Sequence, residues 1–168
     1  MHRPLSAVAL AAAAVALAPG AGHAAATATT APWATVNLCN TPERPLVMGV
    51  RAFVPRRAGA AQWARIRVQW FDDATQAWKR VRAVDRWDKL GPGRASRFGG
   101  RDFQFRAPDP GRRLLLRGVV DVQWREGSKV VARKRVRTSA GHADPNDPYL
   151  KDSRKVCEIV SGTDAGRS

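Results

Sequence analysis

The sequence predicts an all-β protein, an antiparallel two-sheet β-sandwich of the immunoglobulin-like type with about seven or eight strands. Apolar and polar side chains alternate over much of residues 33–161, which is the period of a half-buried strand. Proline, glycine and aspartate interrupt this alternation at short intervals, as turns between strands do. After the N-terminal apolar run, no window of about 11 residues shows the stripe of an amphipathic helix. These observations favour two packed antiparallel sheets.

The chain begins with the layout of a cleavable secretory signal peptide, which we place at residues 1–26. A basic start at Arg3 precedes an Ala/Val/Leu run over 5–17, and a Pro-Gly pair ends that run. Small residues then offer a cleavage site after Ala24 or Ala26. The apolar run is too short to cross a bilayer as a helix. We therefore expect the signal helix to be removed and the mature chain to be secreted without a transmembrane segment.

One domain is expected after the signal peptide. We place a flexible leader at 27–32, the β-sandwich domain at 33–161 and a disordered tail at 162–168. The remaining length is typical of a single domain and can bury a sizeable core.

Four strands are expected in the first half of this domain. The first, 33–40, carries Cys39, and the second, 46–54, lies between two prolines that bound it. The third, 63–71, ends at an Asp-Asp pair, and the fourth, 78–84, returns from the turn that this pair begins.

The second half is expected to hold four more strands and two irregular stretches. A long connection with Gly-rich turns is predicted at 85–100, and a second irregular stretch at 139–153. A Glu-Gly-Ser turn joins the longest strand to the one that follows it. The strands themselves are predicted at 101–107, 113–125, 129–138 and 155–160.

Two segments of the chain repeat one pattern. Val-Gln-Trp at 68–70 leads, after a turn, to Lys-Arg-Val-Arg at 79–82, and Val-Gln-Trp at 122–124 leads to Lys-Arg-Val-Arg at 134–137. Each unit is an alternating strand, a polar turn and an alternating return strand, so each predicts a hairpin. The match between the two is either a true correspondence of register or a chance similarity of amphipathic hairpins.

Strand alternation also predicts which side chains face the core. Burying one large apolar side chain stabilises a fold by about 1.5–3 kcal/mol, so the apolar face of each strand turns inward. The expected core residues are Val50, Ile66, Val68, Trp70, Val81, Phe103, Phe105, Leu116, Val120, Val122, Trp124 and Val136.

The opposite faces of the same strands are rich in arginine and tryptophan. If the two hairpins share a sheet, these residues form a basic surface suited to the phosphates or carboxylates of an anionic polymer. The alternative is structural: Trp63 and Trp78 cover the sheet edge, the arginine stems pack flat over them, and the cations discourage aggregation. The candidate polyanion-binding residues are Trp63, Arg65, Arg67, Trp78, Arg80, Arg82, Arg133, Arg135 and Arg137.

The charge balance of the chain is strongly basic. The sequence has 29 Lys and Arg against 14 Asp and Glu, a formal net charge of +15. Such an excess attracts polyanions. It is also what the composition of a high-GC genome produces, since the chain is rich in Ala, Arg, Gly and Pro.

Two cysteines, Cys39 and Cys157, are the only ones in the chain. An even number in an exported protein favours a disulfide, here between the first and last strands. A loop this long gives a stabilisation of about 5 kcal/mol in the chain-entropy model. A catalytic or metal-binding pair is the alternative, and no neighbouring residue supports it.

Catalytic and metal-binding motifs are missing from the sequence. His142 is the single histidine after the signal peptide, no Gly-x-Ser-x-Gly elbow occurs, and no Cys/His spacing fits zinc. The oxygen-rich stretch 142–148 fails the EF-hand pattern and predicts turns instead. We therefore expect no catalytic residues, no cofactor and no metal. A hydrolase with a carboxylate pair is the alternative, drawn from Asp72, Asp73, Asp85 and Asp88.

The two hairpins, the segment Thr-Ser-Ala-Gly-His at 138–142 with Asp-Pro after it, and Cys-Glu-Ile at 157–159 carry a resemblance. The chain resembles uncharacterised secreted proteins of actinobacteria that pair a signal peptide with one immunoglobulin-like or fibronectin-like β-sandwich. The resemblance implies this fold and export. It brings no activity and no site residues.

The leading functional hypothesis is a non-catalytic secreted sandwich that binds anionic cell-envelope polymers through its Arg/Trp-rich sheet face. A structural protein–protein interaction module of the envelope is the second, docking through its sheet faces or through 85–100 and 139–153. The expected partners are thus an anionic wall polymer or another envelope protein, and not a specific nucleic acid.

Overall fold

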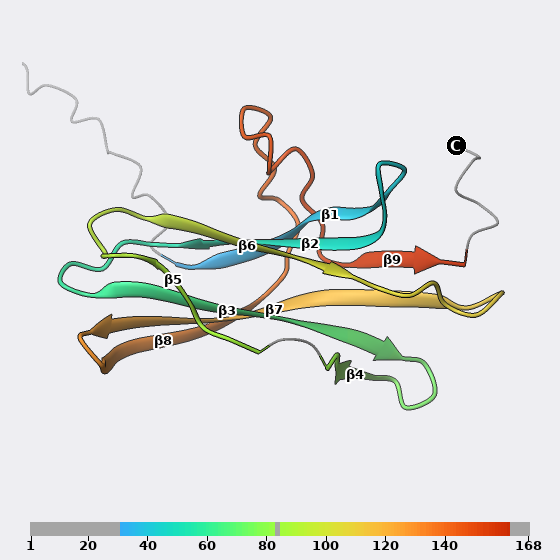
Figure 1. Cartoon of the computed structure of the whole chain (residues 1–168), viewed down its shortest axis with the longest axis horizontal. Helices are drawn as coiled ribbons and strands as arrows, with labels where there is room; N and C mark the ends of the chain where they lie inside the picture. The colour runs from blue at the N-terminus through green and yellow to red at the C-terminus, as the bar shows by residue number, and fades with distance from the viewer. Residues whose placement is uncertain (1–30, 83–84, 162–168) are drawn as a thin grey trace, which may run out of the picture.

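Two antiparallel sheets of unequal size face each other across an apolar core (Figure 1). The computed structural model describes residues 31–82 and 85–161. The predicted signal peptide at 1–26, most of the leader and the tail at 162–168 lie outside the described residues. The smaller sheet is formed, in spatial order, by β1 (Trp33–Thr41), β2 (Arg44–Val54) and β6 (Arg97–Gln104).

The larger sheet has six strands. Its main path runs β4-β3-β7-β8, with β5 paired to β3 and β9 paired to β7. The strands are β3 (Ala61–Asp72), β4 (Ala77–Arg80), β5 (Asp88–Gly91), β7 (Arg113–Glu126), β8 (Lys129–Arg137) and β9 (Cys157–Val160). The predicted all-β fold of two antiparallel sheets is therefore confirmed.

The strand number and some boundaries differ from the prediction. The described residues contain nine strands, because β5 lies inside the expected connection 85–100 and β6 begins at Arg97 within it. The Gly-Gly pair in β6 predicts a turn, but these glycines pair with β2. A Cβ on Gly99 would lie 2.9 Å from Leu90 Cδ2, so glycine here permits a close approach of β5 to β6. The predicted fourth strand is also shorter, since β4 ends at Arg80.

The core lies between the sheets and follows the predicted alternation. Eight of the expected core residues are buried: Val50, Ile66, Val68, Phe103, Leu116, Val120, Val122 and Trp124. The other four, Trp70, Val81, Phe105 and Val136, are partly buried and pack against that cluster. The indole N–H of Trp124 donates to the Pro55 carbonyl at 3.0 Å, which satisfies its polar atom in the core.

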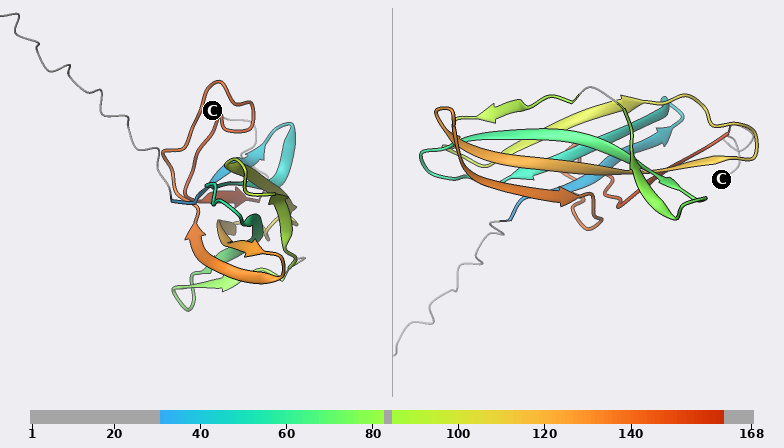
Figure 2. Two further views of the ribbon diagram at one scale, coloured as in Figure 1. Left: turned by 90° about the vertical axis from the view of Figure 1, so that its left-hand side faces the viewer. Right: turned by 90° about the horizontal axis from the view of Figure 1, so that it is seen from below.

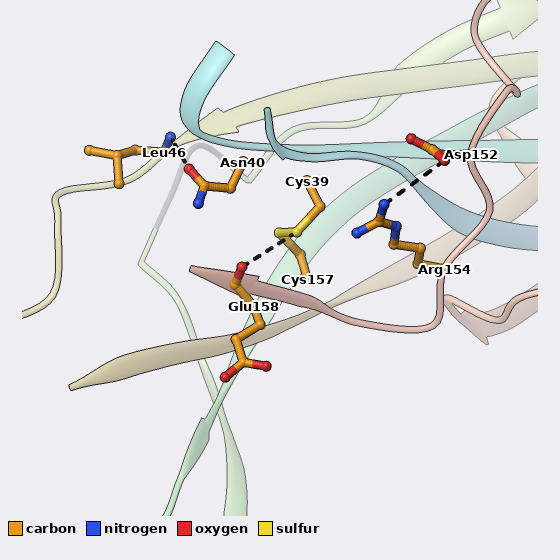
Figure 3. Close-up of a disulfide and its surroundings, with 7 residues drawn as sticks. All are labelled: Cys39, Asn40, Leu46, Asp152, Arg154, Cys157 and Glu158. Atoms are coloured by element: carbon orange, nitrogen blue, oxygen red, sulfur yellow. Dashed lines mark hydrogen bonds and ion pairs between the residues drawn. A yellow bond between two sulfur atoms is a disulfide. The ribbon is translucent and has the colours of Figure 1, made fainter. Parts of the chain in front are cut away.

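The predicted disulfide is present between Cys39 on β1 and Cys157 on β9 (Figure 3). Their Cα atoms lie 5.3 Å apart although 118 positions separate them in the sequence. Because β1 belongs to the smaller sheet and β9 to the larger, the bridge joins the two sheets as well as the first and last strands. Next to it, Val36 and Arg154 exchange backbone hydrogen bonds of 2.9 and 3.0 Å, which hold the chain before β9 against β1.

The segment between β8 and β9 lies over the outer side of the smaller sheet (Figures 1 and 2). The Asn37 side-chain amide donates to the Tyr149 carbonyl at 2.9 Å, and the Thr35 and Ser153 hydroxyls lie 2.8 Å apart. Thr35 is consequently buried although it points away from the core between the sheets. The outer face of the larger sheet holds most of the predicted basic residues.

Candidate polyanion-binding surface

The two repeated hairpins lie side by side in the larger sheet. They are β3–β4 and β7–β8, and β3 pairs directly with β7. The outward positions of all four strands therefore form one continuous surface, which the sequence had left open. We call this surface the arginine face. Its residues are Trp63, Arg65, Arg67, Trp78, Arg80, Arg117, Asp121, Arg125, Arg133, Arg135 and Arg137.

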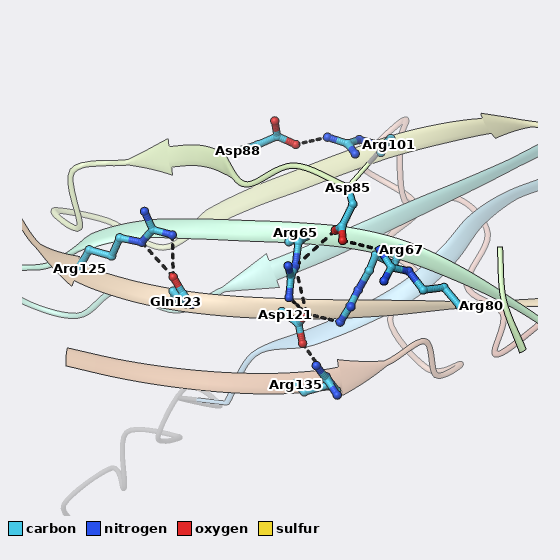
Figure 4. A network of polar contacts seen from close by, with 10 residues as sticks. All are labelled: Arg65, Arg67, Arg80, Asp85, Asp88, Arg101, Asp121, Gln123, Arg125 and Arg135. Atoms are coloured by element: carbon cyan, nitrogen blue, oxygen red, sulfur yellow. Dashed lines mark hydrogen bonds and ion pairs between the residues drawn. The ribbon is translucent and has the colours of Figure 1, made fainter. Parts of the chain in front are cut away.

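A single carboxylate, Asp121 on β7, lies at the centre of the arginine face (Figure 4). In the strand register it has Arg65 of β3 on one side and Arg135 of β8 on the other. Arg65 Nη2 donates to Asp121 Oδ2 at 2.9 Å, and Arg135 Nε donates to Oδ1 at 2.6 Å. Arg67 pairs with Oδ2 as well. Asp121 is 7% exposed, so three arginines enclose one nearly buried acid.

The electrostatics of Asp121 reflect this enclosure. Burial by itself raises the pKa of Asp121, because it disfavours the charged form. The hydrogen bonds from Arg135 and Arg65 and the charge of Arg67 outweigh burial, so the pKa of Asp121 lies below its usual value. The carboxylate is therefore ionised at neutral pH and fixes the positions of three guanidinium groups.

Asp85 supplies a second acid, from the segment between β4 and β5 (Figure 4). It pairs with Arg80, and its Oδ1 lies 3.5 Å from Arg65 Nε. Arg65 is thus shared between the two carboxylates. Two negative charges hold four arginines of the face and neutralise only half of their charge.

The tryptophans of the face are covered by arginine. Arg125 Cζ lies 4.4 Å from the Trp63 ring centroid, and Arg117 Cζ lies 4.1 Å from that of Trp78. This is the packing that the structural alternative predicted, and such stacks contribute about 0.5–1 kcal/mol at exposed sites. The rings are therefore supports for arginine. The cations, and not the rings, are the groups that this surface presents.

Glutamine side chains fix the same arginines from the side. Arg117 Nε donates to Gln69 Oε1 at 2.8 Å, and Arg125 donates to Gln123 Oε1 at 2.9 and 2.7 Å (Figure 4). A neutral acceptor orients a guanidinium without cancelling its charge. These contacts therefore order the face while leaving its positive charge in place.

Arginines of the two hairpins line one small hollow. Its volume is about 130 Å³, and Gln69 and Val119 complete the lining. The four cations around it are Arg67, Arg80, Arg135 and Arg137. Burial lowers the pKa of Arg67, and the charges of Arg65 and Arg135 lower it further against the opposing effect of Asp121. The hollow is therefore a place where positive charge is concentrated and partly desolvated.

Two exposed arginines on the edge strand β8 have no acidic partner. Among the described residues, neither Arg133 nor Arg137 forms an ion pair with a carboxylate. The pKa of Arg117 is lowered by burial and then by the charge of Arg137, so like charges lie close together here. An anion placed between Arg117 and Arg137 would relieve the repulsion between their charges.

One predicted residue is not part of the surface. Arg82 follows the end of β4 and lines a different groove, beside Phe103 and Phe105. The prediction grouped it with Arg80 because it continued the strand through Val84, which lies outside the described residues. The early end of β4 separates the two arginines.

Sequence reasoning also missed several residues of the site. The candidate residues did not include Arg117 or Asp121, although strand alternation puts both on the outward side of β7. Asp121 could have been found from the sequence, because it is an acidic residue at an outward position among outward arginines. Trp87 gave no signal, because it lies in the expected connection, yet Arg65 Cζ lies 4.8 Å from its ring centroid.

The acids and the histidine bear on the alternative of a hydrolase. A general acid needs a pKa raised toward neutrality. Hydrogen bonds from Lys79 and Thr75 lower the pKa of Asp72 to about 2. Asp88 pairs with Arg86 at 3.0 Å. The pKa of Asp121 also lies below its usual value, so neither Asp72 nor Asp121 is prepared as a proton donor.

His142 contacts Ser139, with 3.0 Å between Nε2 and Oγ. Its ring is stacked on Trp33 at a centroid distance of 4.1 Å, and burial lowers the pKa of His142. No acid is hydrogen-bonded to this ring within the described part of the chain. Among the same residues, no three His, Cys, Asp or Glu side chains converge to hold a metal ion.

Comparison with known proteins does not place the chain in a family. No protein-family model matches it, and no curated protein shows significant similarity to it. The resemblance to secreted actinobacterial sandwiches is thus supported only as far as an all-β, two-sheet protein with a disulfide. In residues 31–82 and 85–161, no helix is long and apolar enough to cross a membrane.

Proposed function

We propose that this protein is a non-catalytic, secreted, immunoglobulin-like sandwich that binds anionic cell-envelope polymers through the arginine face. The hollow lined by four arginines is the observation that carries this proposal. The disulfide is consistent with an oxidising location outside the cytoplasm, as is the signal-peptide layout of residues 1–26. The two antiparallel sheets and their paired hairpins support the immunoglobulin-like assignment.

The chemistry of the face favours a ligand with repeated negative charges. A guanidinium offers five N–H donors in a planar fork that matches phosphate and carboxylate oxygens. Asp121 engages only some of the donors of Arg67 and Arg135, so others remain for an anion in the hollow. Eight arginines on the face against Asp121 and Asp85 leave an excess of positive charge along the whole sheet.

A polyphosphate titration tests the proposal. The disulfide-bonded protein is titrated calorimetrically with long-chain polyphosphate at several NaCl concentrations, and R80Q/R137Q is compared with R94Q/R112Q. Both double variants lose the same charge, but only the first pair lines the hollow. Each lost charge-assisted hydrogen bond costs about 1.5–3 kcal/mol, so R80Q/R137Q should lose tenfold or more in affinity.

The control variant R94Q/R112Q should bind within about twofold of the natural protein. Affinity should also fall steeply with salt, because the interaction is ionic. Equal losses in the two double variants would show that net charge alone attracts the polymer, and the assigned surface would be wrong. Binding no tighter than that of an unrelated protein of equal charge would remove the polyanion function itself.

A further inference from the structure

A second binding feature lies at the edge of β6, the last strand of the smaller sheet. A groove of about 770 Å³ runs between this strand and the chain that follows β4. One wall is formed by six consecutive residues, 101–106, and the other by Val81, Arg82 and Arg86. Successive side chains of a strand point to opposite faces, so six in a row line a groove only along the edge of the strand.

This edge carries backbone groups without a strand partner. Within the described residues, β6 pairs with β2 alone and is the last strand of the smaller sheet. Near its start the edge is protected: Leu90 packs on Gly99, and Arg101 pairs with Asp88. Beyond Arg101 no strand of the described chain pairs with that edge, so residues 102–106 are open to a further strand.

The floor of the groove is apolar and its rim is positive. Phe103 is 8% exposed, and Phe105 and Val81 pack against the core from partly buried positions. Arg82 and Arg106 are exposed and have no carboxylate partner among the described residues. The rim carboxylate of the groove, Asp102, is paired with Arg44 at 2.7 Å, so it does not offset them.

We propose that the free edge of β6 receives an extended acidic peptide of a partner protein as an added strand. The peptide alternates apolar and acidic residues. Its backbone pairs with β6, its apolar side chains pack on Phe103, and its acidic side chains meet Arg82 and Arg106. A second copy of this chain fits less well, because antiparallel pairing of two β6 edges brings arginines against arginines.

The direction of one backbone group gives a sharp test. The Phe105 N–H donates to the Leu46 carbonyl of β2 at 2.9 Å. Adjacent residues of an antiparallel strand point their N–H groups in opposite directions, so the Gln104 N–H points to the open edge. Gln104→Pro removes this donor and leaves the pairing with β2 intact. Gln104→Ala is its control, because the Gln104 side chain also donates to the Pro45 and Leu46 carbonyls.

The experiment measures fluorescence anisotropy of labelled peptides as long as the 101–106 segment. The probes are an alternating Glu-Val peptide, a scrambled peptide of the same composition and an alternating Lys-Val peptide. The natural protein should bind the alternating Glu-Val peptide at least tenfold more tightly than the other two. Q104P should lose at least tenfold, and Q104A less than twofold.

A second variant keeps the test decisive if Q104P does not fold. R82E/R106E alters exposed side chains only and should reverse the preference from the Glu-Val to the Lys-Val peptide. The proposal is overturned if Q104P folds and binds like the natural protein, or if the scrambled peptide binds equally. It is also overturned if sedimentation shows a dimer that Q104P abolishes, since the edge is then occupied by a second copy. The arginine face lies elsewhere, so these results leave the polyphosphate titration unaffected.

Discussion

The outer faces of the two sheets accommodate their outward-pointing side chains in different ways. Each strand must turn half of its side chains away from the core. On the larger sheet many of these side chains are arginines, three of which are held by Asp121. On the smaller sheet they include Trp33, Phe53 and Phe98, whose rings contact one another at 5.4–5.8 Å between centroids.

The aromatic face of the smaller sheet needs a cover, and the segment between β8 and β9 supplies it. His142 stacks on Trp33, and Arg51 Cζ lies 5.0 Å from the Tyr149 ring centroid and 5.1 Å from that of Phe98. Arginine is thus used on both faces. On the smaller sheet the half-buried Arg51 lies between the rings of Phe98 and Tyr149. On the larger sheet arginines themselves form much of the outer layer, from Arg67, which is 16% exposed, to Arg135, which is 61% exposed. The contrast teaches that the exposed charge of the arginine face is a property of its residues and not a general consequence of sheet geometry.

Removing the disulfide should have the largest effect and should act unequally on the two sheets. C39A/C157A should lower the free energy of unfolding by about 4 kcal/mol in urea denaturation. Hydrogen exchange should then accelerate most in β1 and in the segment before β9, because the bridge holds these together. The β3–β7 ladder should stay protected. A loss under about 1 kcal/mol, or uniform acceleration in both sheets, would contradict this division.

Asp121→Asn should have the next largest effect and should be confined to the arginine face. It leaves Arg65, Arg67 and Arg135 without their shared charge, and breaking such a largely buried cluster costs about 2–3 kcal/mol. Urea denaturation measures the loss. Asp73→Asn, an exposed acid in a turn, is the control and should change stability by less than about 0.5 kcal/mol. An equal effect of both changes would mean that Asp121 does not organise the face.

The pH dependence of stability should separate the two faces. The pKa of Asp121 lies below its unfolded value, so its contribution is full above about pH 4 and is lost as the pH falls through the folded-state pKa. The pKa of His142 is lowered too, so its contribution is present above about pH 6.5 and is lost as the pH falls below that value.

His142→Phe should remove the upper of these two phases. The phenyl ring keeps the stack on Trp33 but does not titrate, so unfolding measured between about pH 6.5 and pH 5 should become flat. The effect should be a few tenths of a kcal/mol, because the ring is only partly buried. Asp121→Asn should leave this phase unchanged. A slope that persists in H142F would show that another group titrates there.

The fold was largely readable from the sequence because alternation encodes it. Strand β3 shows this best: Ile66 and Val68 are buried as predicted, and Arg65 and Arg67 point outward as predicted. The buried Gln62 and Ala64 were not among the expected core residues. Strand β5 was missed because it has only four residues, which is too few for an alternating pattern to be recognised. It is defined instead by its pairing with three residues of β3. The glycines of β6 predicted a turn, but both pair with β2, and Gly99 allows the close approach of Leu90 from β5.

The candidate site was readable only in part. Its cations were found from alternation, but their neighbours depend on which strands pair. The Asp121 cluster requires β3 and β8 to flank β7, and this arrangement is a property of the sheet rather than of any one strand. Sequence reasoning therefore predicted a row of arginines and missed the acid that orders it.

The most direct test of the arginine face is to observe its guanidinium groups while a polyanion binds. NMR spectra of the arginine side chains, recorded during titration with polyphosphate, should show the largest shifts at Arg67, Arg80 and Arg137 around the hollow. Arg51 on the covered face and Arg94 in a distant turn should shift little. Shifts of equal size at all exposed arginines would contradict the account, because they would show attraction to net charge without a site.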